Sequence, residues 1–198
     1  MNKNYFNNHF LILYIYPFIL GGLTVLSFQP FNLTFINFII FPLFFYLIFY
    51  IEKKSKSIYR KRPYKTNFFI AGQSFGFGFY LLGISWIANS LTFDENFKIL
   101  IPFAIIFIPF FLGLFISLPV LFIGPKLKLD FISILIFSGS FAFSDYLRGK
   151  LFTGFPWNLW AYSTSSIIEI TQSLNFLGLY AFNLVTITIF LTPIVFFF

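Results

Sequence analysis

The sequence contains no cysteine and only one histidine, His9, among its 198 residues. The lack of cysteine excludes disulfides, thiolate metal ligands and a cysteine nucleophile within these residues. A single histidine, without a second histidine or a carboxylate cluster beside it, predicts an interfacial side chain and no metal site. Charged residues are also scarce, at 10%, against about a quarter in soluble domains. We therefore expect no metal, no other cofactor and no soluble domain.

Apolar residues are abundant in this chain. They make up 59% of the chain, and 36 of them are phenylalanine. They form runs long enough to cross a hydrocarbon layer of about 30 Å, which predicts an all-α polytopic transmembrane helix bundle. No small-residue cleavage site follows the first run, so we expect it to stay as an uncleaved span. The six predicted spans are residues 10–28, 33–51, 67–91, 99–123, 131–147 and 177–198.

The basic residues are unevenly placed along the chain. Segment 52–66 holds seven of the thirteen lysines and arginines. With a cytoplasmic N-terminus, ten of them lie on the inner side and three on the outer side, as the positive-inside rule requires. This predicts a basic cytoplasmic loop at 52–66 and an outer loop at 148–166. A contact of the basic loop with anionic lipid is an alternative role, whereas no nucleic-acid-binding fold surrounds it.

Glycines mark one face of the third span. Gly72, Gly76 and Gly83 are four and seven residues apart, so another helix backbone can approach them closely. Gly76-Phe77-Gly78 is not a dinucleotide loop, because no strand precedes it and a leucine replaces the third glycine. Residues 166–175 predict a short helix lying in the membrane interface.

The outer loop begins with charge at a helix end. Asp145 and Arg148 are three residues apart, so they can share a helix face and form an ion pair. The alternative is that the Arg148 guanidinium binds a phosphate, such as that of a lipid headgroup.

A rigid turn follows at Gly154-Phe155-Pro156-Trp157. Glycine permits a positive φ, and Pro156 restricts both its own backbone and that of Phe155. Trp157, Trp160 and Tyr162 are amphipathic rings suited to the headgroup boundary. An aromatic belt explains the rings, and a shaped apolar surface for an acyl chain is the competing interpretation.

Catalytic groups are not evident in this loop. Ser163 would need Lys150 as a base, and Asp145 with Glu169 would need to meet as an acid and a base, which their spacing does not predict. We expect no catalytic residue in this chain.

The motif from Asp145 to Ser163 resembles the membrane portion of bacterial apolipoprotein N-acyltransferases. That family commonly has Glu-x-Leu-Arg-Gly, then Thr-Gly-Phe-Pro-Trp and Gly-Tyr-Ser, whereas this chain has Asp145 for the glutamate and Ala161 for the glycine. Gly21 to Phe31 and Gly76 to Trp86 also agree with the family, so the resemblance covers nearly the whole chain.

The resemblance implies a role with lipid substrates in the bacterial inner membrane. The family transfers an acyl chain from phospholipid to the amino group of a lipoprotein's N-terminal cysteine. Its catalytic Glu, Lys and Cys belong to a nitrilase-like domain that this sequence does not contain. We therefore expect a truncated or split form that is inactive alone, with phospholipid and lipoprotein as substrates and a separate nitrilase-like chain as a possible partner. The substrate-binding residues we expect are Arg148, Gly154, Phe155, Pro156, Trp157 and Tyr162.

Two other classes of protein compete with this interpretation. The chain could be a non-catalytic lipid-binding or assembly protein that keeps the membrane scaffold. A small transporter ranks last, because the predicted spans offer almost no ionisable groups for a polar pathway.

Overall fold

The computed structural model of the chain describes residues 9–58, 63–151 and 154–197, and within them it contains helices and no strand. Lys3, Arg60, Lys61, Arg62 and Thr153, which carry part of the predicted topology and motif, lie outside the described residues. The elements are η1 (Leu11–Ile15), α2 (Tyr16–Thr24), η2 (Val25–Ser27), η3 (Thr34–Ile36), α3 (Asn37–Ile58), α4 (Pro63–Ile84), η4 (Ser85–Thr92), η5 (Glu95–Leu100), α5 (Ile101–Ile123), η6 (Gly124–Lys126), α6 (Phe131–Arg148), η7 (Trp160–Thr164), α7 (Ile168–Thr171), α8 (Leu174–Leu177), α9 (Leu179–Leu191) and η8 (Thr192–Phe197). The all-α helical membrane bundle predicted from the sequence is confirmed.

Four helical stretches among the described residues are long and apolar enough to cross a membrane: Thr34–Lys54, Lys65–Thr92, Glu95–Lys126 and Leu179–Phe196. Leu11–Ser27 forms a shorter apolar helix where the first span is expected. The expected fifth span corresponds to α6, which has 18 residues and is not among the four. Its serines and its terminal charges dilute its apolar character. The count of six spans stays a prediction.

Helix α4 is packed between two other helices by glycines on opposite faces. A Cβ on Gly76 would lie 2.8 Å from the Gly113 Cα, and one on Gly72 would lie 2.7 Å from the Ser117 Cα, both in α5. On the other face, Gly21 of α2 lies against the Phe75 backbone. Two of the three glycines predicted to meet a helix therefore do so. Gly83 differs, because it meets the Asn158 side chain instead.

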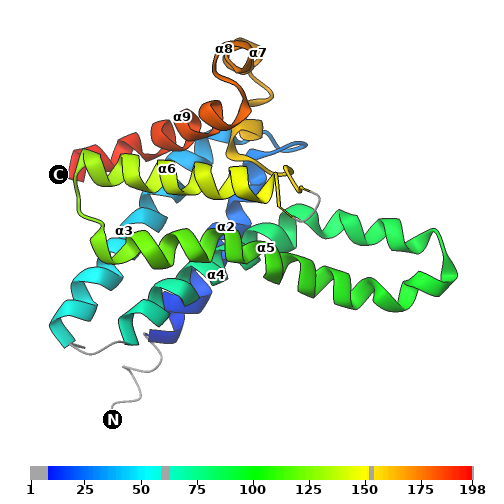
Figure 1. The fold of residues 1–198 in the computed structure, drawn as a ribbon, viewed down its shortest axis with the longest axis horizontal. Helices are drawn as coiled ribbons and strands as arrows, with labels where there is room; N and C mark the ends of the chain where they lie inside the picture. The colour runs from blue at the N-terminus through cyan, green and yellow to red at the C-terminus, as the bar shows by residue number, and fades with distance from the viewer. Residues whose placement is uncertain (1–8, 59–62, 152–153, 198) are drawn as a thin grey trace.

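After α4 the chain continues through η4 and η5 into the first part of α5, and these segments form a long hairpin that projects past the other helices (Figure 1). Helix α6 packs along α9, which also contacts α3 (Figure 1). The central core is aromatic, and Trp160 lies at its middle. Its ring stacks on Phe79 at 4.4 Å between centroids and meets Phe41 edge-on at 4.9 Å. Trp160 is thus a buried core residue, which corrects its predicted place at the headgroup boundary.

Helices α3 and α4 extend into the segment predicted as a basic loop, ending at Ile58 and beginning at Pro63. Lysine is a good helix former, and Lys53 and Lys54 near this end of α3 are exposed. Figure 1 shows this end of α3 and α4 far from the end of α6 that carries Arg148. The membrane side that each end faces stays a prediction.

The start of α6 is capped by Asp130, whose carboxylate accepts the Ser133 N–H at 2.7 Å. Hydrogen bonds from the Ser133 side chain and backbone lower the pKa of the Asp130 carboxyl. The interfacial segment expected at 166–175 contains the short helix α7 and the start of the short helix α8, and Ile168 and Ile170 of α7 are exposed.

Candidate functional site

The last turn of α6 holds a buried ion pair. Asp145 and Arg148 lie on one helix face, and the Arg148 Nη2 and Nε atoms donate to the Asp145 Oδ1 at 2.9 and 3.3 Å. The Arg148 side chain is 1% exposed. The pair predicted from the spacing is present, and it is buried rather than at the surface.

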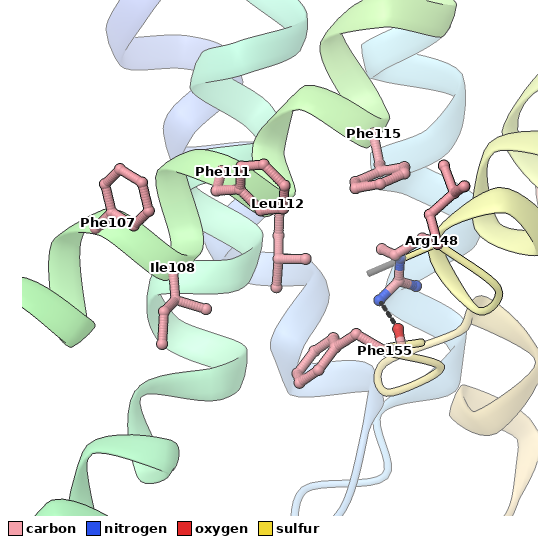
Figure 2. Close-up of a pocket in the computed structure, with 8 residues that line it drawn as sticks. Phe107, Ile108, Phe111, Leu112, Phe115, Arg148 and Phe155 are labelled. Carbon is pink, nitrogen blue, oxygen red and sulfur yellow. Dashed lines mark hydrogen bonds between the residues drawn. The ribbon is translucent and has the colours of Figure 1, made fainter. Parts of the chain in front are cut away.

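Arg148 also holds the chain that follows α6. Its Nη1 donates to the backbone carbonyls of Phe155, at 3.0 Å, and Trp157, at 2.7 Å. The Phe155 N–H in turn donates to the Arg148 carbonyl at 2.9 Å, and Figure 2 shows the bond from the guanidinium to Phe155. The guanidinium also lies 5.3 Å from the centre of the Tyr80 ring. Four of its five N–H groups are thus used within the protein, so the structure gives Arg148 a fixed structural role.

Asn183 of α9 completes the network, and nothing in the sequence interpretation singled it out. Its Nδ2 donates to the Asp145 Oδ2 at 2.9 Å, and its Oδ1 accepts the Ala161 N–H at 3.0 Å. The side chain is fully buried. The sequence feature that could have identified Asn183 is an amide side chain inside an apolar helix. Such a group needs hydrogen-bond partners when it is buried.

The turn between α6 and η7 has the backbone that its residues predict. Gly154 adopts φ +82° and Asn158 adopts φ +56°, both in the region that side chains disfavour. A Cβ on Gly154 would also lie 2.7 Å from the Gly149 carbonyl oxygen. Glycine at 154 is therefore needed for both conformation and space. We call residues 149–151 and 154–159 the Arg148 loop.

The aromatic residues of this region do not share one environment. Trp157 is 54% exposed and meets the Trp86 ring of the hairpin edge-on at 6.0 Å. Phe155, Pro156 and Tyr162 are half-buried. Burial, with a further contribution from Tyr180, raises the pKa of the Tyr162 hydroxyl. Trp157 is the most exposed ring of this group.

A cavity of about 190 Å³ opens between α5 and the Arg148 loop. Apolar side chains of α5 form one wall, while Arg148, Leu151 and Phe155 form the other (Figure 2). The α5 residues are Phe107, Ile108, Phe111, Leu112 and Phe115. The structure thus brings two of the predicted site residues, Arg148 and Phe155, to one cavity. Gly154, Pro156, Trp157 and Tyr162 do not line it.

The hydroxyl groups near the loop are engaged in local hydrogen bonds. Ser163 and Thr164 donate to the backbone carbonyls three residues before them, at 2.7 and 2.8 Å. Asp145 is held in its ion pair, whereas Glu169 is exposed. In the described part of the chain, no group of three or more His, Asp or Glu side chains could hold a metal ion.

The fold defines a multi-pass helical membrane protein, and an apolar cavity lies between its helix α5 and the Arg148 loop. Residues 20–191 match the family described as the apolipoprotein N-acyltransferase N-terminal domain, and the chain belongs to this family. The matched range includes Asp145, Arg148, the Arg148 loop and Asn183.

Curated relatives agree with this assignment. The chain is 34% identical over 176 residues to the apolipoprotein N-acyltransferase of Rhodopseudomonas palustris. It is 30% identical to that of Bradyrhizobium diazoefficiens over 174 residues and 31% identical to that of Brucella melitensis over 180 residues. These matches cover 88%, 87% and 89% of the chain, but only 32%, 31% and 33% of the relatives. The chain thus spans about a third of the length of the curated relatives it matches.

Proposed function

We propose that the chain is the membrane part of a lipoprotein N-acylation system in a bacterial inner membrane. Its role is to bind the phospholipid that donates an acyl chain and to present it, with the lipoprotein acceptor, at the membrane surface. The family membership and the names of the relatives support this proposal. The acyl-transfer chemistry itself belongs to a nitrilase-like part, supplied in the same or in a separate polypeptide.

The observation that carries the proposal is the apolar cavity closed by the Arg148 loop. Its wall consists of phenylalanine, leucine and isoleucine side chains from α5, which suit a hydrocarbon chain and not a polar metabolite. Because Arg148 binds two carbonyls of the loop, the loop keeps its shape while lipid enters and leaves. Arg148 therefore acts on substrate chiefly by positioning Phe155 and Trp157, with Gly154 and Pro156 shaping the turn between α6 and these rings.

The chain supplies no acyl carrier of its own, since it contains no cysteine. In acyl transfer through a thioester, a thiolate attacks the phospholipid ester carbonyl and releases the lysophospholipid alcohol. The lipoprotein amine then attacks the thioester, forms the amide and releases the thiol. We assign that thiolate to the nitrilase-like part. The contribution of the membrane part is then the orientation of the ester relative to that nucleophile.

A chimera tests the proposal directly. The chain replaces the matched segment of the Rhodopseudomonas palustris relative, and the chimera is expressed in bacteria depleted of their own N-acyltransferase. We expect N-acylated lipoprotein, detected by mass spectrometry of its N-terminal peptide. The intact relative is the positive control, and the relative without its matched segment is the negative control. A chimera that accumulates in membranes at the level of the intact relative but leaves lipoprotein unacylated overturns the proposal.

The alternative is a non-catalytic lipid-binding protein, which the same cavity would serve. It differs in one result: the purified chain would bind phospholipid, while the chimera would stay inactive. Co-purification of a nitrilase-like polypeptide with the tagged chain would favour the split enzyme over this alternative.

A further inference from the structure

A second and larger cavity adjoins the first along the seam between α5 and α6. It has a volume of about 490 Å³, within the range of about 300–1,000 Å³ typical of sites for small molecules. The two cavities share Phe111, Phe115 and Leu151. Its other lining residues are Leu114, Leu118, Pro119, Phe122 and Ile123 of α5, with Ser140, Phe143, Ser144 and Leu147 of α6. We call the two cavities together the α5–α6 groove.

The groove exists because α5 and α6 each pack mainly on another helix. Gly113 of α5 lies against Gly76 of α4, and this close approach holds α5 to α4. Helix α6 lies along α9 and is tied to it by the bond from Asn183 to Asp145. The seam between these two pairs is therefore left partly open.

One hydrogen bond crosses the seam and keeps its two walls in register. Pro119 has no N–H, so the Phe115 carbonyl one turn earlier lacks its partner within the helix. The Ser144 hydroxyl of α6 donates to that carbonyl. This bond pairs the backbone carbonyl that Pro119 would leave without a partner, so this carbonyl adds no unpaired polar group to the wall of the groove.

The groove has the length of one acyl chain. Phe111 and Ile123 are twelve residues apart in α5, which at about 1.5 Å per residue is about 18 Å. Half of a hydrocarbon core of about 30 Å is about 15 Å. The larger cavity thus matches the depth that an acyl chain reaches from one membrane surface.

The charge at the loop end of the groove fits a phosphate. Arg148 lines the smaller cavity, but Asp145 neutralises it. Lys150 is exposed, forms no ion pair within the described residues, and directly precedes Leu151, which lines both cavities. An uncompensated ammonium group beside the mouth of an apolar groove complements the headgroup of a phospholipid.

We propose that the α5–α6 groove holds one acyl chain of a phospholipid, with its phosphate at Lys150. The proposal rests on the proposed function in that this lipid is the acyl donor. Ser140 and Leu118 face the chain from opposite walls, so the side chains at these two positions set how much hydrocarbon the groove accepts.

Native mass spectrometry of the purified chain, titrated in detergent with palmitoyl-oleoyl phosphatidylethanolamine, tests the groove. We expect one tightly retained lipid per chain. Ser140→Trp fills the groove and should weaken retention by at least about tenfold, since the indole excludes two or more methylene groups. Leu118→Trp should act likewise from the other wall, so the test holds even where one variant fails to fold. Ile136→Trp and Phe110→Trp place the same indole at exposed positions outside the groove and should retain lipid as the wild type does.

The headgroup contact is tested in the same titration. Lys150→Glu should weaken retention several-fold, whereas Lys126→Glu, at the other end of α5, should leave it unchanged. Equal retention by the wild type, Ser140→Trp and Leu118→Trp overturns the proposal. Loss of a dimer rather than of lipid in these variants also overturns it, because a second copy then fills the groove.

The titration measures binding without acyl transfer, so its failure is separate from that of the proposed function. A chimera that acylates lipoprotein normally while carrying Ser140→Trp leaves the proposed function standing and removes the groove as the donor site. If the chain retains lipid in the groove but its chimera is inactive, the groove stands as a lipid site and the proposed function is overturned.

Discussion

The Asn183 amide of α9 donates to the Asp145 carboxylate of α6 at 2.9 Å, and the same amide accepts the backbone N–H of Ala161. One fully buried side chain therefore joins two helices and the start of η7. Through Asp145 it also supports Arg148 and the loop that Arg148 holds.

Replacing Asn183 by alanine should destabilise the chain. The substitution leaves the Asp145 Oδ2 and the Ala161 N–H without these partners in a buried site, which costs roughly 1–3 kcal/mol. Thermal unfolding in detergent measures the loss. Asn175→Ala removes an exposed amide and should change little. Equal melting temperatures for the two variants would contradict the role given to Asn183.

Replacing Arg148 by alanine should be more damaging, by about 3–5 kcal/mol, because it leaves a buried carboxylate without its cation. The double variant Asp145→Asn with Arg148→Gln removes both charges and should recover part of the stability. Unfolding curves of the wild type, Asp145→Asn, Arg148→Gln and the double variant form a thermodynamic cycle. If the two single losses simply add in the double variant, the ion pair is not coupled as described.

Arg148→Lys separates the charge from the geometry. A lysine can pair with Asp145, but its one ammonium group lacks the fork that reaches the Phe155 and Trp157 carbonyls as well. We expect near wild-type helix content and a loop that trypsin or chymotrypsin cleaves faster. Cleavage at the wild-type rate would show that the loop holds its shape without the guanidinium.

Two glycines of the same region should respond in opposite directions to alanine. Gly154→Ala forces a side chain into φ +82° and should cost about 1–2 kcal/mol. Gly139 lies inside α6, where a Cβ meets no atom within 4 Å, so Gly139→Ala should stabilise the helix by about 0.5–1 kcal/mol. Melting temperatures that shift in the same direction would contradict this pair of predictions.

The N-cap of α6 predicts a loss of stability in acid. The folded state lowers the pKa of Asp130, so its contribution is present above the pKa of the unfolded chain, about 3.9, and is lost as the pH falls through the folded value. Asp130→Asn keeps a capping side chain but has no proton to bind. The difference in melting temperature between wild type and variant should therefore shrink when the pH falls from 6 to 3.

Much of this architecture follows from local sequence patterns. Helical spans follow from the length of apolar runs, and the close contact of α4 with α5 follows from Gly72 and Gly76. The Asp145–Arg148 pair and the positive φ of Gly154 likewise depend on neighbouring residues alone. The positions of the helix ends were less predictable, because lysine-rich segments can continue a helix as readily as they can leave it.

Features that depend on distant segments were not predictable in the same way. Trp160 reads as an interfacial ring, yet it is packed among phenylalanines from three other segments of the chain, which only the tertiary fold brings together. The partner of Asp145 in α9 lies 38 residues away. The groove is a gap between two helix pairs, so no residue type or local sequence pattern predicts it.

The placement of α4 between backbones on both sides limits how this protein can change. Phe75 meets Gly21 on one face, while its neighbour Gly76 meets Gly113 on the other. Adding a methyl group at Gly21 or Gly76 would push α4 toward the helix on its other face. That helix is already in close contact with the α4 backbone, so α4 has no space to move. Mutational drift along this three-helix stack should therefore be slow, and variation should collect instead on the lipid-facing sides of α5 and α6.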